Sequence, residues 1–207
     1  MRICSSVAAP LLLCFFAAAG MLAPPASARG ESIFNGGFET GNLSGWTHSG
    51  NTSFTNVVGA GFAGNSAHSG NFWVALGPVG SDGVLLQATA TDITPLAPYT
   101  FSFWLWSDGN IPNDFAAKFD GGTLFSAANE PAHAWTLHSF TVVPITSTAT
   151  VQFSFRNDPG YLGLDDISLQ SNAVPAVPTP MAGFGGLVLI GGLGLHQTLR
   201  TRRRAVA

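Results

Sequence analysis

The sequence predicts an all-β domain, a jelly-roll β-sandwich, on three observations. The chain is rich in Thr, Ser, Phe, Val and Gly and has almost no runs of the helix formers Glu, Lys and Leu. Short segments that alternate apolar and polar residues recur along residues 29–172. Clusters of turn residues, such as GPVGSDG at 77–83, separate most of these segments. Eight short strands at this spacing indicate a sandwich or jelly roll.

The expected strands, in chain order, are Ser53–Val58, Asn71–Gly77, Val84–Ala90, Tyr99–Ser107, Asp114–Phe119, Trp135–Val143, Thr150–Arg156 and Gly163–Leu169. The fourth strand shows the clearest alternation. Its first, third, fifth and seventh residues are Tyr99, Phe101, Phe103 and Leu105, and we expect them in the core. The residues between them include Trp104 and Trp106, which are therefore expected to face water or a cleft.

Both ends of the chain are expected to serve targeting. Residues 1–28 combine Arg2, an apolar run at 7–22 and Ala-Ser-Ala at 26–28, the pattern of a secretory signal peptide. Residues 173–180 form a Pro-rich linker, 181–199 a transmembrane segment and 200–207 a basic cytoplasmic tail. A buried core helix is the alternative for each apolar run, and Pro and Gly residues argue against it.

The net charge of the domain excludes some classes of binding partner. Residues 29–173 hold all 11 acidic residues and only three of the eight basic ones, so their formal charge is 3 − 11 = −8. Because so acidic a domain repels other anions, it is a poor candidate for binding nucleic acid or anionic lipid. Its charge is typical of a soluble extracellular domain, of a domain that binds cations, or of both. Both cysteines lie in the expected signal peptide, so the exported domain has no disulfide.

Carboxylates stand near both ends of the domain. Glu39 lies in NGGFETGNLSGW at 35–46, and Asp165 and Asp166 interrupt the apolar YLGLDDISL at 161–169. By alternation, Asp165 shares a face with Ile167 and Leu169, so its charge needs a partner. Because domain termini are often adjacent, the three carboxylates could meet in an oxygen-only site suited to calcium. The alternative, which composition alone favours, is that they accept hydrogen bonds from turn N–H groups.

These two motifs resemble the bracketing motifs of galactose-binding-like jelly rolls, a group that includes carbohydrate-binding module families four, nine and twenty-two. The resemblance covers roughly residues 32–170 and implies that Glu39 and one of Asp165 and Asp166 help to ligate a structural calcium ion. HSGNFWVAL at 68–76 resembles the segment that gives a backbone carbonyl ligand, here near Gly70.

The C-terminus resembles a PEP-CTERM sorting signal. It has the motif Val177-Pro178-Thr179-Pro180, an apolar span and a basic cluster with Arg202, Arg203 and Arg204. The usual glutamate of the motif is replaced by Thr179. The resemblance implies an exosortase-type partner, anchoring in the inner membrane of a Gram-negative cell, then cleavage and release to the surface or extracellular matrix. A plain membrane anchor is the alternative.

The aromatic residues supply the candidate ligand site. Trp73, Trp104 and Trp106 are expected on one mixed face, flanked by Gln87, Gln152 and Arg156, where flat indoles would stack on sugars and polar groups would bind hydroxyls. Alternatively, loops cover these tryptophans, which then simply pack.

No Gly-x-Ser-x-Gly elbow, His-Glu-x-x-His motif or P-loop is present, and His133 and His138 would face opposite sides of a strand. We therefore expect a non-catalytic exported protein that binds carbohydrate or exopolysaccharide. The alternative is a structural or adhesive extracellular protein with no specific small ligand. An enzyme would require a cleft with converging titratable groups.

Overall fold

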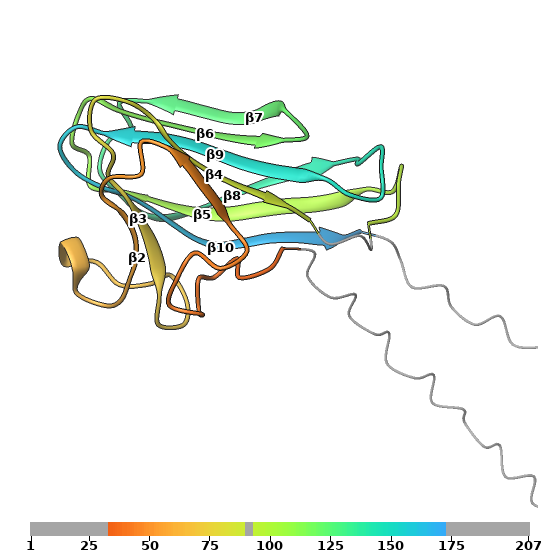
Figure 1. Cartoon of the computed structure of the whole chain (residues 1–207), viewed down its shortest axis with the longest axis horizontal. Helices are drawn as coiled ribbons and strands as arrows, with labels where there is room; N and C mark the ends of the chain where they lie inside the picture. Colours follow the sequence, from red (N-terminus) through yellow and green to blue (C-terminus); the bar gives the residue numbers. More distant parts are fainter. Residues whose placement is uncertain (1–32, 90–92, 173–207) are drawn as a thin grey trace, which may run out of the picture. The chain divides into compact units, whose positions relative to one another are not determined.

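The computed structural model describes residues 33–89 and 93–172, which form two five-stranded antiparallel sheets (Figure 1). The first sheet has the order β1-β4-β9-β6-β7 and consists of β1 (Thr47–Gly50), β4 (Gly83–Ala88), β9 (Thr150–Asn157), β6 (Asn113–Phe119) and β7 (Gly122–Ala128). The second has the order β2-β3-β10-β5-β8 and consists of β2 (Thr55–Val58), β3 (Trp73–Leu76), β10 (Leu162–Ser171), β5 (Tyr99–Ser107) and β8 (His133–Val142). The all-β prediction is confirmed, and the arrangement is consistent with a jelly-roll sandwich.

Phenylalanine rings from both sheets fill the space between them. Phe101 and Phe103 of β5 are fully buried, as are Phe153 and Phe155 of β9. The rings of Phe103 and Phe153 meet edge to face across the sheets, with centroids 5.3 Å apart. The alternation in β5 therefore places its residues as expected, and replacing any one such ring by alanine would cost about 3–5 kcal/mol.

The sequence pattern does not predict two edge strands, β1 and β7, or one short helix. Strand β1 carries no apolar alternation, and every residue of the edge strand β7 is exposed or half-buried. The 3₁₀ helix η1 (Phe62–Gly64) lies between β2 and β3.

The face of strand β10 on which Asp165 was expected is wrong. A bulge interrupts the β10–β5 pairing between Asp165 and Ser168, and Asp166 has a left-handed φ of 46°. Both Leu164 and Ile167 therefore belong to the core, whereas Asp165 pairs with Trp104 on the outer face. Asp165 does not share a face with Ile167.

Among the described residues, no helix has the length and apolarity to cross a membrane. The predicted signal peptide (1–28), linker with sorting motif (173–180), transmembrane segment (181–199) and basic tail (200–207) lie outside the described residues.

Candidate functional site

Four tryptophans gather on the outer face of the second sheet, and we call them the tryptophan cluster: Trp73, Trp104, Trp106 and Trp135. Trp73 meets Trp106 and Trp135 edge to face, with centroids 5.7 Å away in each case. The side chain of Trp73 is 0% exposed, and the other three are half-buried. The expectation that Trp73 offers a surface for a ligand is therefore wrong.

The segment 59–72, between β2 and β3, covers this cluster. The rings of Phe62 and Trp73 meet edge to face, and the indole N–H of Trp135 donates a 2.9 Å hydrogen bond to the carbonyl of Ser66. The imidazole of His68 stacks on Trp104 with centroids 3.7 Å apart. One face of the Trp104 indole is thus occupied by protein, as in the alternative in which loops cover the tryptophans.

The structure does not bring the expected polar partners to the tryptophans. Gln87, Gln152 and Arg156 belong to β4 and β9, in the first sheet, whereas Trp104 and Trp106 belong to the second. Which sheet a strand joins is decided by long-range pairing, which the local sequence pattern does not report.

Gln87 has a structural role instead. It is only 5% exposed, its amide N–H donates to the carbonyls of Phe34 and Gly45, and its carbonyl accepts from the N–H of Phe34. These bonds attach the first described segment to β4. Because the amide is buried and its N–H and carbonyl groups are bonded to the backbone, it is not available to a ligand.

Arg156 lies among carboxylates. Its Nε is 3.4 Å from Oδ2 of Asp114 and 3.2 Å from Oδ2 of Asp158. Partial burial raises the pKa of Asp114, and the negative charge of Asp82 raises it further. Two carboxylates thus lie beside the guanidinium and a third, Asp82, acts on Asp114, so the local charge is negative.

The three predicted carboxylate ligands contact one loop, which also carries the fourth predicted ligand, Gly70; we call Glu39, Asp165, Asp166 and the loop 68–72 the acidic clasp. Oε1 of Glu39 accepts 2.9 Å hydrogen bonds from the N–H groups of Asn71 and Phe72. Oδ2 of Asp165 accepts from the N–H of His68 at 2.9 Å. The clasp therefore joins the first described segment and the last strand to the same loop.

Asp166 completes the clasp. Its Oδ2 lies 2.6 Å from Nδ1 of His68, and its Oδ1 accepts from the hydroxyl of Ser69 at 2.8 Å. Gly70 has a φ of 63°, and a Cβ there would overlap the carboxylate of Glu39. A Cβ at Gly37 would lie 3.2 Å from Oδ1 of Asp166. Small residues therefore let the carboxylates approach the backbone.

The carboxylates differ in electrostatics. Asp165 is 0% exposed, and burial together with the adjacent charge of Asp166 raises its pKa to about 7. Backbone N–H donors, chiefly that of Phe72, lower the pKa of Glu39. Across residues 33–89 and 93–172, no three His, Cys, Asp or Glu side chains form a group that could hold a metal ion. The clasp closes through N–H and O–H donors, and calcium stays a prediction.

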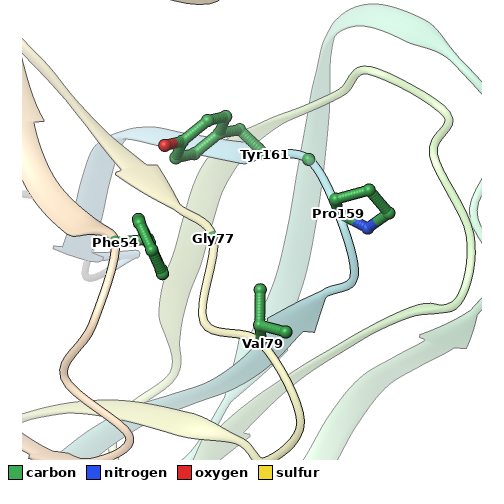
Figure 2. Close-up of a pocket in the computed structure, with 6 residues that line it drawn as sticks. Phe54, Gly77, Val79, Pro159 and Tyr161 are labelled. Carbon is green, nitrogen blue, oxygen red and sulfur yellow. The ribbon is translucent and has the colours of Figure 1, made fainter.

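A pocket of about 190 Å³ lies where three connections meet, and we call it the Phe54–Tyr161 pocket. Phe54 precedes β2, Gly77 and Val79 link β3 to β4, and Pro159, Gly160 and Tyr161 link β9 to β10. Figure 2 shows the side chains of Phe54, Val79, Pro159 and Tyr161 arranged around the backbone of Gly77. The sequence pattern does not predict this pocket, because these segments have the composition of turns; Tyr161, which directly follows DPG, was the available signal.

Comparison with solved structures finds the same fold in proteins whose structures contain a bound saccharide. The structure of TmCBM61 in complex with β-1,4-galactotriose is 26% identical, covers 70% of this chain and 100% of its own, and has a TM-score of 0.54. An arabinose-bound α-L-arabinofuranosidase, MgGH51, is 14% identical over 75% of this chain and 28% of its own, with a TM-score of 0.55.

An adhesin domain also shares the fold. The K3 cleaved adhesin domain of Lys-gingipain from Porphyromonas gingivalis is 17% identical over 68% of this chain and 97% of its own, with a TM-score of 0.50. No curated protein matches. Residues 30–160 match the family model described as a carbohydrate binding domain. Because this match spans more than half of the chain, the protein belongs to that carbohydrate-binding domain family.

Proposed function

We propose that the protein is an exported, non-catalytic surface or matrix protein that binds carbohydrate or exopolysaccharide through exposed aromatic side chains. The observation that carries the proposal is the match of residues 30–160 to a family of binding domains. The similar structure that holds β-1,4-galactotriose supports a saccharide ligand and supplies a first probe. A binding domain needs no catalytic groups, and its strength comes from apolar contact with a few placed polar groups.

The test measures binding of the full-length protein to defined saccharides by calorimetry. The neutral probes are β-1,4-galactotriose, cellotriose and xylotriose, and the anionic probe is a galacturonic acid trimer. Saturable binding of at least one probe is the expected result. If none of these probes or the corresponding polysaccharides binds, the protein is not a carbohydrate-binding protein and the proposal fails.

A second candidate is a structural or adhesive extracellular protein with no specific small ligand. The packing of the tryptophan cluster beneath the segment 59–72 favours it, because Trp73 and one face of Trp104 are unavailable to a ligand. Under this alternative, no saccharide would bind, yet removal of the protein from the cell surface would reduce attachment between cells.

Calcium at the acidic clasp is also part of the proposal. Oxygen donors from Glu39, Asp165 and Asp166, with a backbone carbonyl near Gly70, would hold the ion by the hard ligands that it prefers. What supports it is the adjacency of Asp165 and Asp166, two carboxyl groups whose described hydrogen bonds come from backbone N–H groups, the hydroxyl of Ser69 and the imidazole of His68, with no Lys or Arg among them.

For localisation, we propose export, transient anchoring in the inner membrane, and release to the cell surface or matrix by an exosortase-type enzyme. Support comes from Val177-Pro178-Thr179-Pro180, the apolar run after it and the arginines at 202–204. Replacing Pro178 by alanine, or deleting residues 200–204, should change the size of the mature protein or its location. Processing that matches the wild type would instead support a plain membrane anchor.

A further inference from the structure

We infer that the Phe54–Tyr161 pocket is the carbohydrate-binding site and that it takes one terminal, uncharged sugar ring. The inference rests on the proposed function and goes further by naming the site and the class of ligand. The tryptophan cluster is the competing location.

The walls of the pocket suit the apolar faces of a sugar ring. The side chain of Phe54 is 57% exposed and that of Val79 48% exposed, although both are large and apolar. Tyr161 contributes a half-buried second ring. Aromatic rings give a sugar broad C–H contact, and exposed apolar groups gain free energy when a ligand covers them.

The aromatic walls are fixed before any ligand arrives. The backbone N–H of Tyr161 donates a 2.7 Å hydrogen bond to Oδ2 of Asp108, and its ring packs edge-on against Phe62 with centroids 5.0 Å apart. A Cβ at Gly77 would lie 2.6 Å from Cε1 of Tyr161. Only glycine therefore lets the tyrosine ring rest against this backbone.

Phe54 is held in a conformation that a phenylalanine rarely adopts. Its φ is 55°, in the left-handed region, and its carbonyl accepts a 3.0 Å hydrogen bond from the N–H of Gly77. Glycine would adopt this φ without strain, so the ring at this position has a cost in stability. A strained, exposed residue at the mouth of a pocket is explained when its ring contacts a ligand, and its fixed backbone limits the entropy lost on binding.

The size of the pocket limits the ligand. Its volume of about 190 Å³ is below the roughly 300–1,000 Å³ typical of sites that enclose drug-sized molecules. Such a space admits one sugar ring, whereas an internal stretch of a polysaccharide needs a groove open at both ends. The pocket therefore selects a chain end or a branch tip.

The surrounding charge selects a neutral sugar. Asp158 precedes Pro159 of the pocket wall, and its Oδ1 accepts from the N–H of Gly80 at 2.8 Å. Residues 33–89 and 93–172 contain nine acidic and two basic residues, a formal charge of 2 − 9 = −7. A uronic acid or sulfated sugar would be repelled, and a neutral ring would not.

The first experiment removes the ring without straining the backbone. In Phe54→Gly, the left-handed conformation is allowed, so the fold should be kept or slightly stabilised. We expect the variant to bind the neutral probe about tenfold or more weakly, a change of about 1.4 kcal/mol. The matched control is Phe34→Ala, which removes a phenylalanine ring that is 60% exposed and does not line the pocket. Its affinity should equal that of the wild type.

The second experiment varies the ligand. Affinity per chain should be equal from the disaccharide to the hexasaccharide, because one terminal ring fills the pocket, and the galacturonic acid trimer should not bind. Affinity that climbs with every added sugar, or preference for the anionic trimer, would overturn the inference.

A third variant separates failure of the site from failure of the function. If Phe54→Gly binds as the wild type does, while Trp106→Ala loses binding with an unchanged melting temperature, the sugar lies on the tryptophan cluster. The inference is then wrong and the proposed function stands. If the wild type binds no saccharide, both are wrong.

Discussion

The imidazole of His68 stacks on the indole of Trp104 at a centroid distance of 3.7 Å, with the ring planes 17° apart. Nδ1 of the same imidazole is 2.6 Å from Oδ2 of Asp166. One histidine thus joins the tryptophan cluster to the acidic clasp. The loop that carries it is held from both sides, which explains how a segment with little secondary structure covers the outer face of the second sheet.

Trp104→Ala should reduce stability and leave saccharide affinity unchanged. The indole is half-buried between His68 and its sheet neighbours, so its loss should cost about 2 kcal/mol, below the roughly 3–5 kcal/mol of a fully buried tryptophan. Urea unfolding and calorimetry measure the two quantities. Ser139→Ala, an exposed change on the neighbouring strand β8, is the control. Lost affinity at an unchanged unfolding midpoint would place the ligand on Trp104.

Gly70→Ala should destabilise the protein more than Gly121→Ala does. Both glycines have left-handed φ values, 63° and 79°, so each substitution incurs a backbone cost of about 1–2 kcal/mol. Only at Gly70 would the new Cβ also overlap the Glu39 carboxylate, whereas Gly121 has open space. Urea unfolding should therefore give the larger loss for Gly70→Ala.

The double variant Gly70→Ala/Glu39→Ala shows whether that excess comes from the clasp. Shortening Glu39 removes the overlap, so the two changes should be less than additive. Strict additivity would mean that the Glu39 side chain does not press against Gly70 in solution.

In EDTA, the contribution of Asp165 to the free energy of unfolding should decrease as the pH rises from about 4 to about 7. Its folded pKa, about 7, is above its ordinary value of 3.8, so its contribution is fully present below the ordinary value and is lost as the pH rises through the folded one. Asp165→Asn removes this titration while leaving Asp166 and His68 in place. The stability of the variant relative to the wild type should therefore improve from pH 4 to pH 8. A constant difference in unfolding free energy across this range contradicts the raised pKa.

The sequence predicts the parts of the fold that depend on local alternation. The bounds of Tyr99–Ser107 agree with the structure because core and surface residues alternate there without interruption. It does not predict β1, an edge strand with no apolar pattern. Nor does alternation survive the bulge at Asp166, because one extra residue moves Asp165 to the opposite face.

For the site, the sequence correctly predicts that the acidic residues of the two motifs lie close together. The polar residues that it predicts beside the tryptophans lie elsewhere. Glu39 and the pair Asp165 and Asp166 do meet at one loop, as the position of the two motifs at the domain ends predicts. Gln87 does not reach the tryptophans because it lies in the other sheet and bonds to the backbone of Phe34. Pairing between strands is a long-range property, and so is the meeting of three turns that forms the Phe54–Tyr161 pocket.

Removal of calcium should lower the melting temperature of the wild type and leave Glu39→Ala unchanged. The reason is that an ion held by Glu39, Asp165 and Asp166 would stabilise only the folded state, in which the three carboxylates bond to the same loop. Thermal unfolding is measured with EDTA and with added calcium. The matched control is Glu130→Ala. Glu130 lies outside the clasp, and its backbone rather than its side chain makes the described hydrogen bonds, so the variant should keep the wild-type response.

If chelator leaves the wild-type melting curve unchanged, the clasp is closed by its N–H and O–H donors alone. Because Glu39 accepts two backbone N–H bonds in any case, Glu39→Ala should then still lower the melting temperature, by the same amount with and without calcium.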